Sequence, residues 1–273
     1  MDTTNLFSLK NKVIVVTGGT GILGGAFVKG IANAGGAVVI LGRNSTVGNE
    51  RAEEINASGG DAIFIAVDVL EEADLLKAKE IILEKYGKID GLVNAAGGNI
   101  PEAVVQPDAD IFNMNIDGMK RAMVLNLWGT IIPTQIFGSV MAQKGSGSIV
   151  NISSVSSKQV VTKVLGYSMG KAAVDIYTQW FGVEVANRFG DAIRVNAIMP
   201  GFFLTEQNRT LLTQPDGSYT DRGNSVIKNT PFKRFGKPEE LVGALVYLLS
   251  DASKFVTGMQ LGVDGGFTVF SGV

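Results

Sequence analysis

The chain has 273 residues, of which 45% are hydrophobic, and its 24 basic side chains nearly balance its 26 acidic ones. A net charge of −2 gives no electrostatic basis for binding nucleic acid or an anionic membrane. Because the chain lacks Cys and His, disulfides, thiol nucleophiles, imidazole triads and Cys/His metal sites are excluded, and acid–base chemistry must come from Tyr, Lys, Asp or Glu.

Short β-branched runs alternate with longer helical patterns. The predicted strands are Val13–Val16, Ala37–Leu41, Ala62–Val67, Gly91–Val93, Ser148–Ile152, Arg194–Ile198 and Gln260–Val263. The helices predicted between them include Ile22–Asn33, Val47–Ala57, Glu71–Tyr86 and Pro238–Leu249. Several strands are apolar almost throughout, which is typical of a parallel sheet buried on both faces. The pattern predicts an α/β fold of the Rossmann type, a doubly wound parallel sheet of about seven strands.

No linker or internal repeat divides the chain, so we expect one domain over residues 1–273. The N-terminal segment is polar and lacks the basic residues of a signal peptide, and no apolar run approaches the ~18 residues of a membrane-spanning helix. We therefore expect a cytoplasmic protein with no membrane partner. The long polar stretch at residues 201–231 follows a strand end, where such sheets bind ligands, and we predict that it is a mobile lid.

The first strand runs into a glycine-rich turn. Gly19, Gly21 and Gly24 form a G-x-G-x-x-G pattern directly before a helix, where glycines let a pyrophosphate approach the backbone and the helix N-terminus. The alternative is a merely tight strand–helix turn. The expected cofactor contacts here are Gly18, Gly19, Thr20, Gly21, Ile22 and Leu23.

The end of the second strand bears on the choice of cofactor. An acidic residue that would hold the ribose hydroxyls of NAD is missing, and Arg43-Asn44 follows instead. Arg43 is suited to pair with a 2′-phosphate, so NADP(H) is favoured over NAD(H), the alternative being a solvated arginine at a helix start. Asp68 and Val69 follow the third strand, where Asp68 either meets the adenine or caps the next helix.

Tyr167 and Lys171 lie four residues apart and so share one helix face. An ammonium beside a phenol lowers the pKa of the phenol, which makes Tyr167 a candidate acid and base in a chain without His. The same spacing is also common on ordinary helix surfaces. Ser154, 13 residues earlier, ends a strand and either binds a substrate carbonyl or only turns the chain. Asn126 lies within an apolar helix, where a buried amide needs a backbone network or a proton-relay water.

Together these residues resemble the short-chain dehydrogenase/reductase family over nearly the whole chain. The matching motifs are Thr17–Gly24, Asn94-Ala95-Ala96-Gly97, Asn126, Ser154, Tyr167 with Lys171, Pro200-Gly201 with Thr205, and Asp264-Gly265-Gly266. One departure is Ile22, where single-domain members usually have Gly.

The resemblance implies that Tyr167 transfers the proton and that Lys171 lowers its pKa and holds the ribose. It also implies that Ser154 orients the carbonyl and that Asn126 anchors a proton-relay water. Further cofactor contacts are expected at Asn94, Ala95, Ala96, Gly97, Pro200, Gly201, Phe203 and Thr205. Family members suggest a homotetramer, and large apolar residues in the helices predicted at Asp110–Gln143 and Tyr167–Phe189 agree with it, although they could simply pack the core. They include Trp128, Trp180 and Phe181.

Within this family the chain resembles the D-mannonate oxidoreductases (fructuronate reductases) most. The resemblance rests on residues 97–101, 133–135, 201–209, 232–241 and 271–273. It implies a keto-uronate substrate and a cation near its carboxylate, for which Arg209 on the predicted lid is the first choice and Lys158 the second. The expected substrate contacts are Asn99, Ser154, Lys158, Gln207, Asn208 and Arg209.

Two alternatives remain. The substrate could be a deoxy-keto uronate released from alginate or pectin, or the chain could be a non-catalytic dinucleotide-sensing protein on the same fold. A sensor has no need of Ser154, Tyr167 and Lys171 together, so their joint presence favours an enzyme.

Overall fold

All seven predicted strands form, and they lie parallel in one sheet. The structure, a computed structural model, describes residues 3–272, without the side chains of residues 3, 4 and 206–208. The strand order is β3-β2-β1-β4-β5-β6-β7, so the chain reverses its winding direction between β1 and β4. The strands are β1 (Val13–Thr17), β2 (Ala37–Gly42), β3 (Ala62–Ala66), β4 (Gly91–Asn94), β5 (Gly147–Ile152), β6 (Ile193–Pro200) and β7 (Gln260–Val263).

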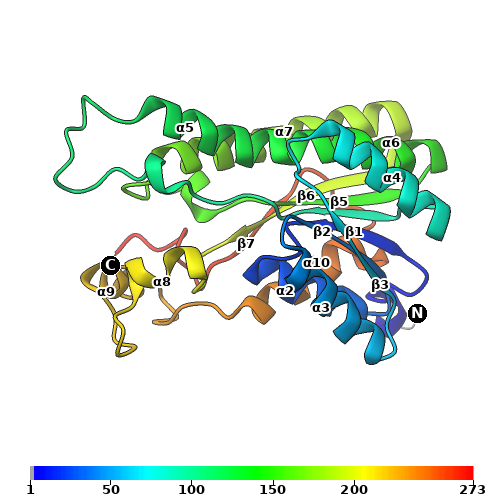
Figure 1. The fold of residues 1–273 in the computed structure, drawn as a ribbon, viewed down its shortest axis with the longest axis horizontal. Helices are drawn as coiled ribbons and strands as arrows, with labels where there is room; N and C mark the ends of the chain where they lie inside the picture. Colours follow the sequence, from blue (N-terminus) through cyan, green and yellow to red (C-terminus); the bar gives the residue numbers. More distant parts are fainter. Residues whose placement is uncertain (1–2, 273) are drawn as a thin grey trace.

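Helices cover both faces of this sheet (Figure 1). One face carries α2 (Ile22–Asn33), α3 (Ser45–Ala57) and α10 (Val242–Leu249), and the other carries α4 (Glu72–Tyr86), α6 (Gly129–Lys144) and α7 (Leu165–Phe189). The residues of β1, β2, β4, β5 and β6 are almost entirely buried, because these parallel strands are covered on both sides, whereas the edge strand β3 is only partly buried. The predicted single doubly wound sheet is confirmed.

Two predicted helices begin or divide differently. The pattern at Pro238–Leu249 forms a 3₁₀ turn at Pro238–Leu241 before α10, with Pro238 at the first position, where its missing N–H costs nothing. The helix expected from Asp110 begins only at Ile116, because Asn115 caps it by accepting a hydrogen bond from the Gly118 N–H.

The helix Ile116–Lys144 corrects the expectation that no apolar segment is long enough to span a membrane. It comprises α5 (Ile116–Met123), a π-helical turn (Val124–Trp128) and α6, and by length and composition alone it could cross one. However, α6 packs against β4 and β5 and contributes the fully buried Phe137 and Met141 to the core. These contacts are those of a core helix in a globular domain.

The segment predicted to be a lid is largely helical. It forms α8 (Glu206–Leu212) and α9 (Asp221–Asn229), which lie beside the C-terminal segment at one end of the molecule (Figure 1). Leu212, Val226 and Phe235 form a small apolar core between them, and the Tyr219 ring packs edge-on against Phe235 at 5.2 Å. The two helices thus form a compact unit with its own core, and its mobility stays a prediction.

Candidate active site

The glycine-rich turn after β1 has no room for side chains at two positions. Gly18 has a φ of +65°, and a Cβ there would lie 2.7 Å from the Ala95 carbonyl oxygen. A Cβ on Gly24 would lie 2.1 Å from the Gly18 carbonyl oxygen. Gly21 is the N-cap of α2, where it has no side chain to satisfy the first backbone N–H groups. The turn therefore presents open backbone donors at a helix N-terminus, as a pyrophosphate site requires.

The Arg51 side chain is hydrogen-bonded to the backbone of this turn, a contact that the sequence analysis did not predict. Its Nη1 donates hydrogen bonds to the carbonyl oxygens of Gly19 and Gly21, the latter at 2.8 Å. Because both carbonyl oxygens accept hydrogen bonds from the positively charged Arg51, their electrostatic repulsion of a bound phosphate is reduced. No sequence pattern distinguishes this arginine, because it lies in the middle of α3 among other polar residues, as a solvent-exposed arginine would.

Thr17 and Asn94 organise the neighbouring β4 loop. The Thr17 hydroxyl accepts hydrogen bonds from the backbone N–H groups of Ala95 (3.1 Å) and Ala96 (3.2 Å). The Asn94 amide nitrogen donates to Thr134 Oγ1 at 2.8 Å and to Asn151 Oδ1 at 2.9 Å. Asn94 is buried in this cross-strand network and is not among the residues that line the cavity, and its contact with the cofactor stays a prediction.

A cavity of about 360 Å³ opens at the carboxyl ends of the strands. It reaches from the glycine-rich turn to the lid helices, which is where ligands bind in a sheet of this winding. The predicted site residues that line it are Gly18, Gly21, Ile22, Leu23, Ala95, Gly97, Asn99, Ser154, Tyr167, Lys171, Pro200, Gly201, Phe203 and Thr205. Residues that the sequence did not single out include Ser153, Ser156, Val161, Val164, Leu211 and Arg222.

Lys171 is buried at the base of this cavity. Its Nζ donates a 2.7 Å hydrogen bond to the Ile152 carbonyl at the end of β5 and lies 5.7 Å from the centre of the Tyr167 ring. Burial lowers the pKa of Lys171 to about 8, while the buried Asp175 carboxylate one turn along α7 acts in the opposite direction. The ammonium therefore has a fixed place and a proton that it can lose near neutral pH.

Tyr167 lies over Lys171 and forms a hydrogen bond with Ser154. Burial raises the pKa of the Tyr167 phenol above its ordinary value, and the hydrogen bond with Ser154 acts in the opposite direction. This corrects the expectation of a lowered pKa: in this structure burial of the phenol outweighs the effect of its neighbours. Tyr167 is thus held in its protonated form, which suits a proton donor.

Ser154 turns the chain and also lines the cavity, while its predicted contact with a substrate carbonyl stays a prediction. Its Oγ accepts a 3.2 Å hydrogen bond from the Ser156 N–H and so caps the short 3₁₀ turn at Val155–Ser157. The same hydroxyl lines the cavity beside Tyr167. The capped turn therefore fixes the Ser154 hydroxyl at the wall of the cavity.

Asn126 lies in the π-helical turn, a local widening that often occurs at functional sites. Its amide nitrogen donates to the carbonyl oxygens of Gly98 (2.7 Å) and Ala122 (2.8 Å), and its Oδ1 accepts from the Gly98 N–H at 3.0 Å. Both amide hydrogens are thus used, and Asn126 is not among the cavity-lining residues. The side chain positions the Gly97–Gly98 loop, and a proton relay at Asn126 stays a prediction.

The residues expected at the adenosine end lie outside the main cavity. Arg43 and Asp68 pair across the ends of β2 and β3, at 3.9 Å, and the Arg43 side chain is 77% exposed. Asn44 caps α3 by accepting from the Val47 N–H at 3.1 Å. The Asp68 carboxylate accepts from the Leu70 N–H at 3.0 Å, whereas Glu71 occupies the N-cap position of α4, so Asp68 turns the chain before the helix.

The structure does not bring the expected carboxylate-binding cations into the cavity. Lys158 pairs with the buried Asp175 at 3.2 Å, and Arg209 is exposed on α8; neither lines the cavity. Lys158 turns to Asp175 because that carboxylate is buried and needs a counter-charge. The predicted contacts Gln207 and Asn208 lie outside the residues whose side chains the structure describes.

Comparison with known proteins gives the chain its family. A family described as enoyl-(acyl carrier protein) reductase matches residues 20–268. The uncharacterized oxidoreductase UxuB of Bacillus subtilis is 41% identical over 97% of this chain and 98% of its own length. The chain belongs to the short-chain dehydrogenase/reductase family.

Solved structures of this family share the whole fold. A Haemophilus influenzae protein with bound NAD, provisionally named a D-mannonate oxidoreductase, superposes with a TM-score of 0.89 at 37% identity and covers 100% of both chains. A gluconate 5-dehydrogenase from Burkholderia cenocepacia, in complex with NADP and tartrate, has a TM-score of 0.86 at 33% identity and covers 97% of this chain and 98% of its own. The chain is therefore a nicotinamide-dependent oxidoreductase that acts on alcohol and carbonyl groups.

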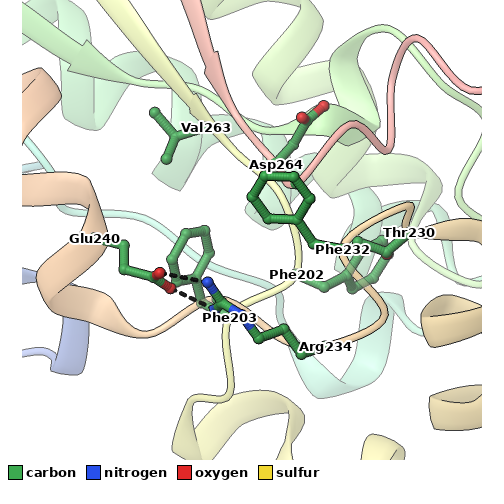
Figure 2. Close-up of a pocket in the computed structure, with 10 residues that line it drawn as sticks. Phe202, Phe203, Thr230, Phe232, Arg234, Glu240, Val263 and Asp264 are labelled. Carbon is green, nitrogen blue, oxygen red and sulfur yellow. Dashed lines mark hydrogen bonds and ion pairs between the residues drawn. The ribbon is translucent and has the colours of Figure 1, made fainter.

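A second, smaller cavity lies at the base of the lid. Figure 2 shows Phe202, Phe203 and Phe232 around it, together with Arg234, which points to Glu240. Two hydrogen bonds of 2.7 and 2.6 Å join the guanidinium and the carboxylate, so the charge of Arg234 is already neutralised. This aromatic cavity supports the lid and offers no free cation to an acidic ligand.

Proposed function

We propose that the chain reduces a keto-uronate of the fructuronate type to the corresponding sugar acid, with Tyr167 as the proton donor. One observation supports the chemistry above all others: Ser154, Tyr167 and Lys171 converge with the glycine-rich turn on a single cavity. The residues fit a nicotinamide dinucleotide, because the turn offers open backbone donors and no Cβ at Gly18 or Gly24.

When bound, the reduced cofactor supplies a hydride to the ketone carbon. The Tyr167 phenol gives its proton to the ketone oxygen as the hydride arrives, which yields the alcohol. The Ser154 hydroxyl, fixed by its bond from Ser156, donates a hydrogen bond to the same oxygen. Lys171 uses one N–H on Ile152 and keeps the others for the ribose, and its charge stabilises the phenolate that remains on Tyr167.

Asn99 supports a polyol substrate. Its Oδ1 is buried and has no hydrogen-bond partner among the described residues, and its side chain lines the cavity. A buried acceptor without a partner costs free energy unless a ligand supplies a donor. A hydroxyl group of a sugar acid would satisfy it, and the similarity to the provisional D-mannonate oxidoreductase supports the same substrate class.

Arg43 supports NADP(H) as the preferred cofactor. Its exposed guanidinium makes one long ion pair with Asp68, so little binding free energy opposes its turning to a 2′-phosphate. Similar structures carry NAD in one case and NADP in others, which fits a site that small changes can switch. We further propose a homotetramer in the cytoplasm and a lid at residues 201–231 that closes over the substrate.

The test is NAD(P)H oxidation against a panel of ketones, run separately with NADH and NADPH. The panel contains D-fructuronate, a deoxy-keto uronate from alginate or pectin, 5-keto-D-gluconate and the neutral ketose D-fructose. We expect the highest kcat/KM for D-fructuronate with NADPH. Tight cofactor binding with no turnover on any member would overturn the proposal and favour a dinucleotide sensor.

A further inference from the structure

The wall of the main cavity contains one cation that the mechanism does not use. Among the described residues that line it, the cationic side chains are Lys171, which is engaged with Ile152, and Arg222. Arg222 is the second residue of α9, after Asp221, and the hydroxyl of the N-cap residue Thr220 accepts a 3.0 Å hydrogen bond from the Gly223 N–H. The cap fixes the start of α9 and therefore the direction from which Arg222 enters the cavity.

The Arg222 guanidinium is partly buried and has only neutral partners. Its Nη1 donates to Thr162 Oγ1 at 3.2 Å and its Nη2 to the Thr162 carbonyl at 3.1 Å. In the part of the chain that the structure describes, no carboxylate lies within ion-pair distance of it. A guanidinium has more N–H donors than these two bonds use. Partial burial lowers the pKa of Arg222 below its ordinary value.

We propose that Arg222 binds the carboxylate of the substrate, an inference that rests on the proposed keto-uronate reductase activity. A planar guanidinium fits a carboxylate with two parallel hydrogen bonds and so fixes the orientation of the whole sugar acid. The apolar side chains of Val161, Val164 and Leu211 line the same cavity and would cover part of a bound sugar acid.

The other candidate cations are already engaged or lie elsewhere. Lys158 pairs with Asp175 and Arg234 pairs with Glu240. Arg209 is exposed and does not line the cavity. Arg222 alone among these four both lines the cavity and lacks an acidic partner.

The position of Arg222 also couples recognition to the lid. It belongs to α9 of the lid, yet it bonds to Thr162 in the segment that leads into α7 and Tyr167. A substrate carboxylate on Arg222 would therefore hold the lid against the segment that positions the proton donor. A neutral ketose gives no such hold, so the carboxylate selects the acid over the neutral sugar.

The experiment compares wild type with Arg222→Met, Arg222→Lys and the matched surface control Arg209→Met. For each protein, kcat/KM is measured with D-fructuronate and with D-fructose, and the dissociation constant of D-mannonate is measured by calorimetry on the complex with NADPH, with which D-mannonate cannot react. Arg222→Met should lower kcat/KM for D-fructuronate and weaken D-mannonate binding, each roughly tenfold to a hundredfold. Its activity on D-fructose and its cofactor affinity should change less than about twofold.

Arg222→Lys should lose less D-fructuronate activity and D-mannonate affinity than Arg222→Met, because lysine keeps the positive charge but cannot form two parallel hydrogen bonds with the carboxylate. Arg209→Met should match wild type in every assay. Equal losses on both sugars, or unchanged D-mannonate binding in Arg222→Met, would overturn the inference. If wild type turns over no keto-uronate, the proposed function fails; D-mannonate binding that still depends on Arg222 would then support the carboxylate site, and no binding would refute it.

Discussion

Arg43 and Asp68 pair across the open ends of β2 and β3, with the guanidinium nitrogen 3.9 Å from the carboxylate oxygen. An exposed pair at this distance contributes about 0–1 kcal/mol, so it can open when a phosphate arrives. The weak pair therefore leaves Arg43 available to a 2′-phosphate. In the absence of cofactor, the Asp68 carboxylate holds the Arg43 side chain near the ends of β2 and β3.

The first prediction follows from this pair. Arg43→Ala should raise KM for NADPH by about ten- to hundredfold, since charge-assisted hydrogen bonds contribute roughly 1.5–3 kcal/mol, and should leave KM for NADH nearly unchanged. The matched control is Arg121→Ala, because Arg121 makes a similar exposed 3.9 Å pair with Glu102. Equal effects on both cofactors would return Arg43 to the role of a solvated surface residue.

The second prediction concerns the glycine-rich turn. In Gly24→Ala the new Cβ would lie 2.1 Å from the Gly18 carbonyl oxygen, so the turn must move. We expect NADPH affinity to fall at least about tenfold, measured by fluorescence titration. The control is Gly243→Ala in α10, where a Cβ meets nothing within 4 Å, and this change should stabilise the helix by up to about 1 kcal/mol. Unchanged cofactor affinity in Gly24→Ala would contradict the account of the turn.

The seven strands and the position of the cavity at their carboxyl ends were predictable because apolar runs and glycines are local signals. The residues that hold the site in place were not. Arg51 and Arg222 meet their partners across 32 and 60 residues of sequence, at spacings with no periodicity to reveal them. The sequence analysis chose Arg209 for the substrate carboxylate and did not single out Arg222, because the exposure of each depends on how α8 and α9 pack on one another.

The third prediction uses the pKa of Lys171. Burial lowers this pKa to about 8 from 10.5, so between these values the unfolded chain binds the proton that the folded chain has released. The free energy of unfolding should therefore rise with pH in this window, by at most about 1.4 kcal/mol per pH unit, relative to Lys171→Met. Below about pH 7 both states are protonated, and the difference between the two proteins should be constant. Urea unfolding of both proteins without cofactor, at pH 6.5 to 9.5, measures this difference in the free energy of unfolding. If the difference did not change with pH over this range, the lowered pKa of Lys171 would be refuted.

The fourth prediction is a symmetric tetramer. Large apolar side chains remain exposed along the long helices, including Trp128 (48%), Ile176 (62%), Trp180 (59%) and Val183 (57%). Phe181 instead stacks on Tyr177 and packs against the core, so it does not contribute to this face. Light scattering at micromolar concentration should give four times the chain mass, and Trp180→Glu should lower it. A monomeric wild type would end this prediction.

The central claim is that Tyr167 donates the proton during reduction, and Tyr167→Phe tests it most directly. This change removes one oxygen from a residue whose ring is held over Lys171. We expect kcat for NADPH-dependent reduction of D-fructuronate to fall on the order of 10²–10⁴-fold, while the dissociation constant of NADPH stays within about twofold of wild type. A Tyr167→Phe variant that retains more than about a tenth of wild-type kcat would show that another group supplies the proton.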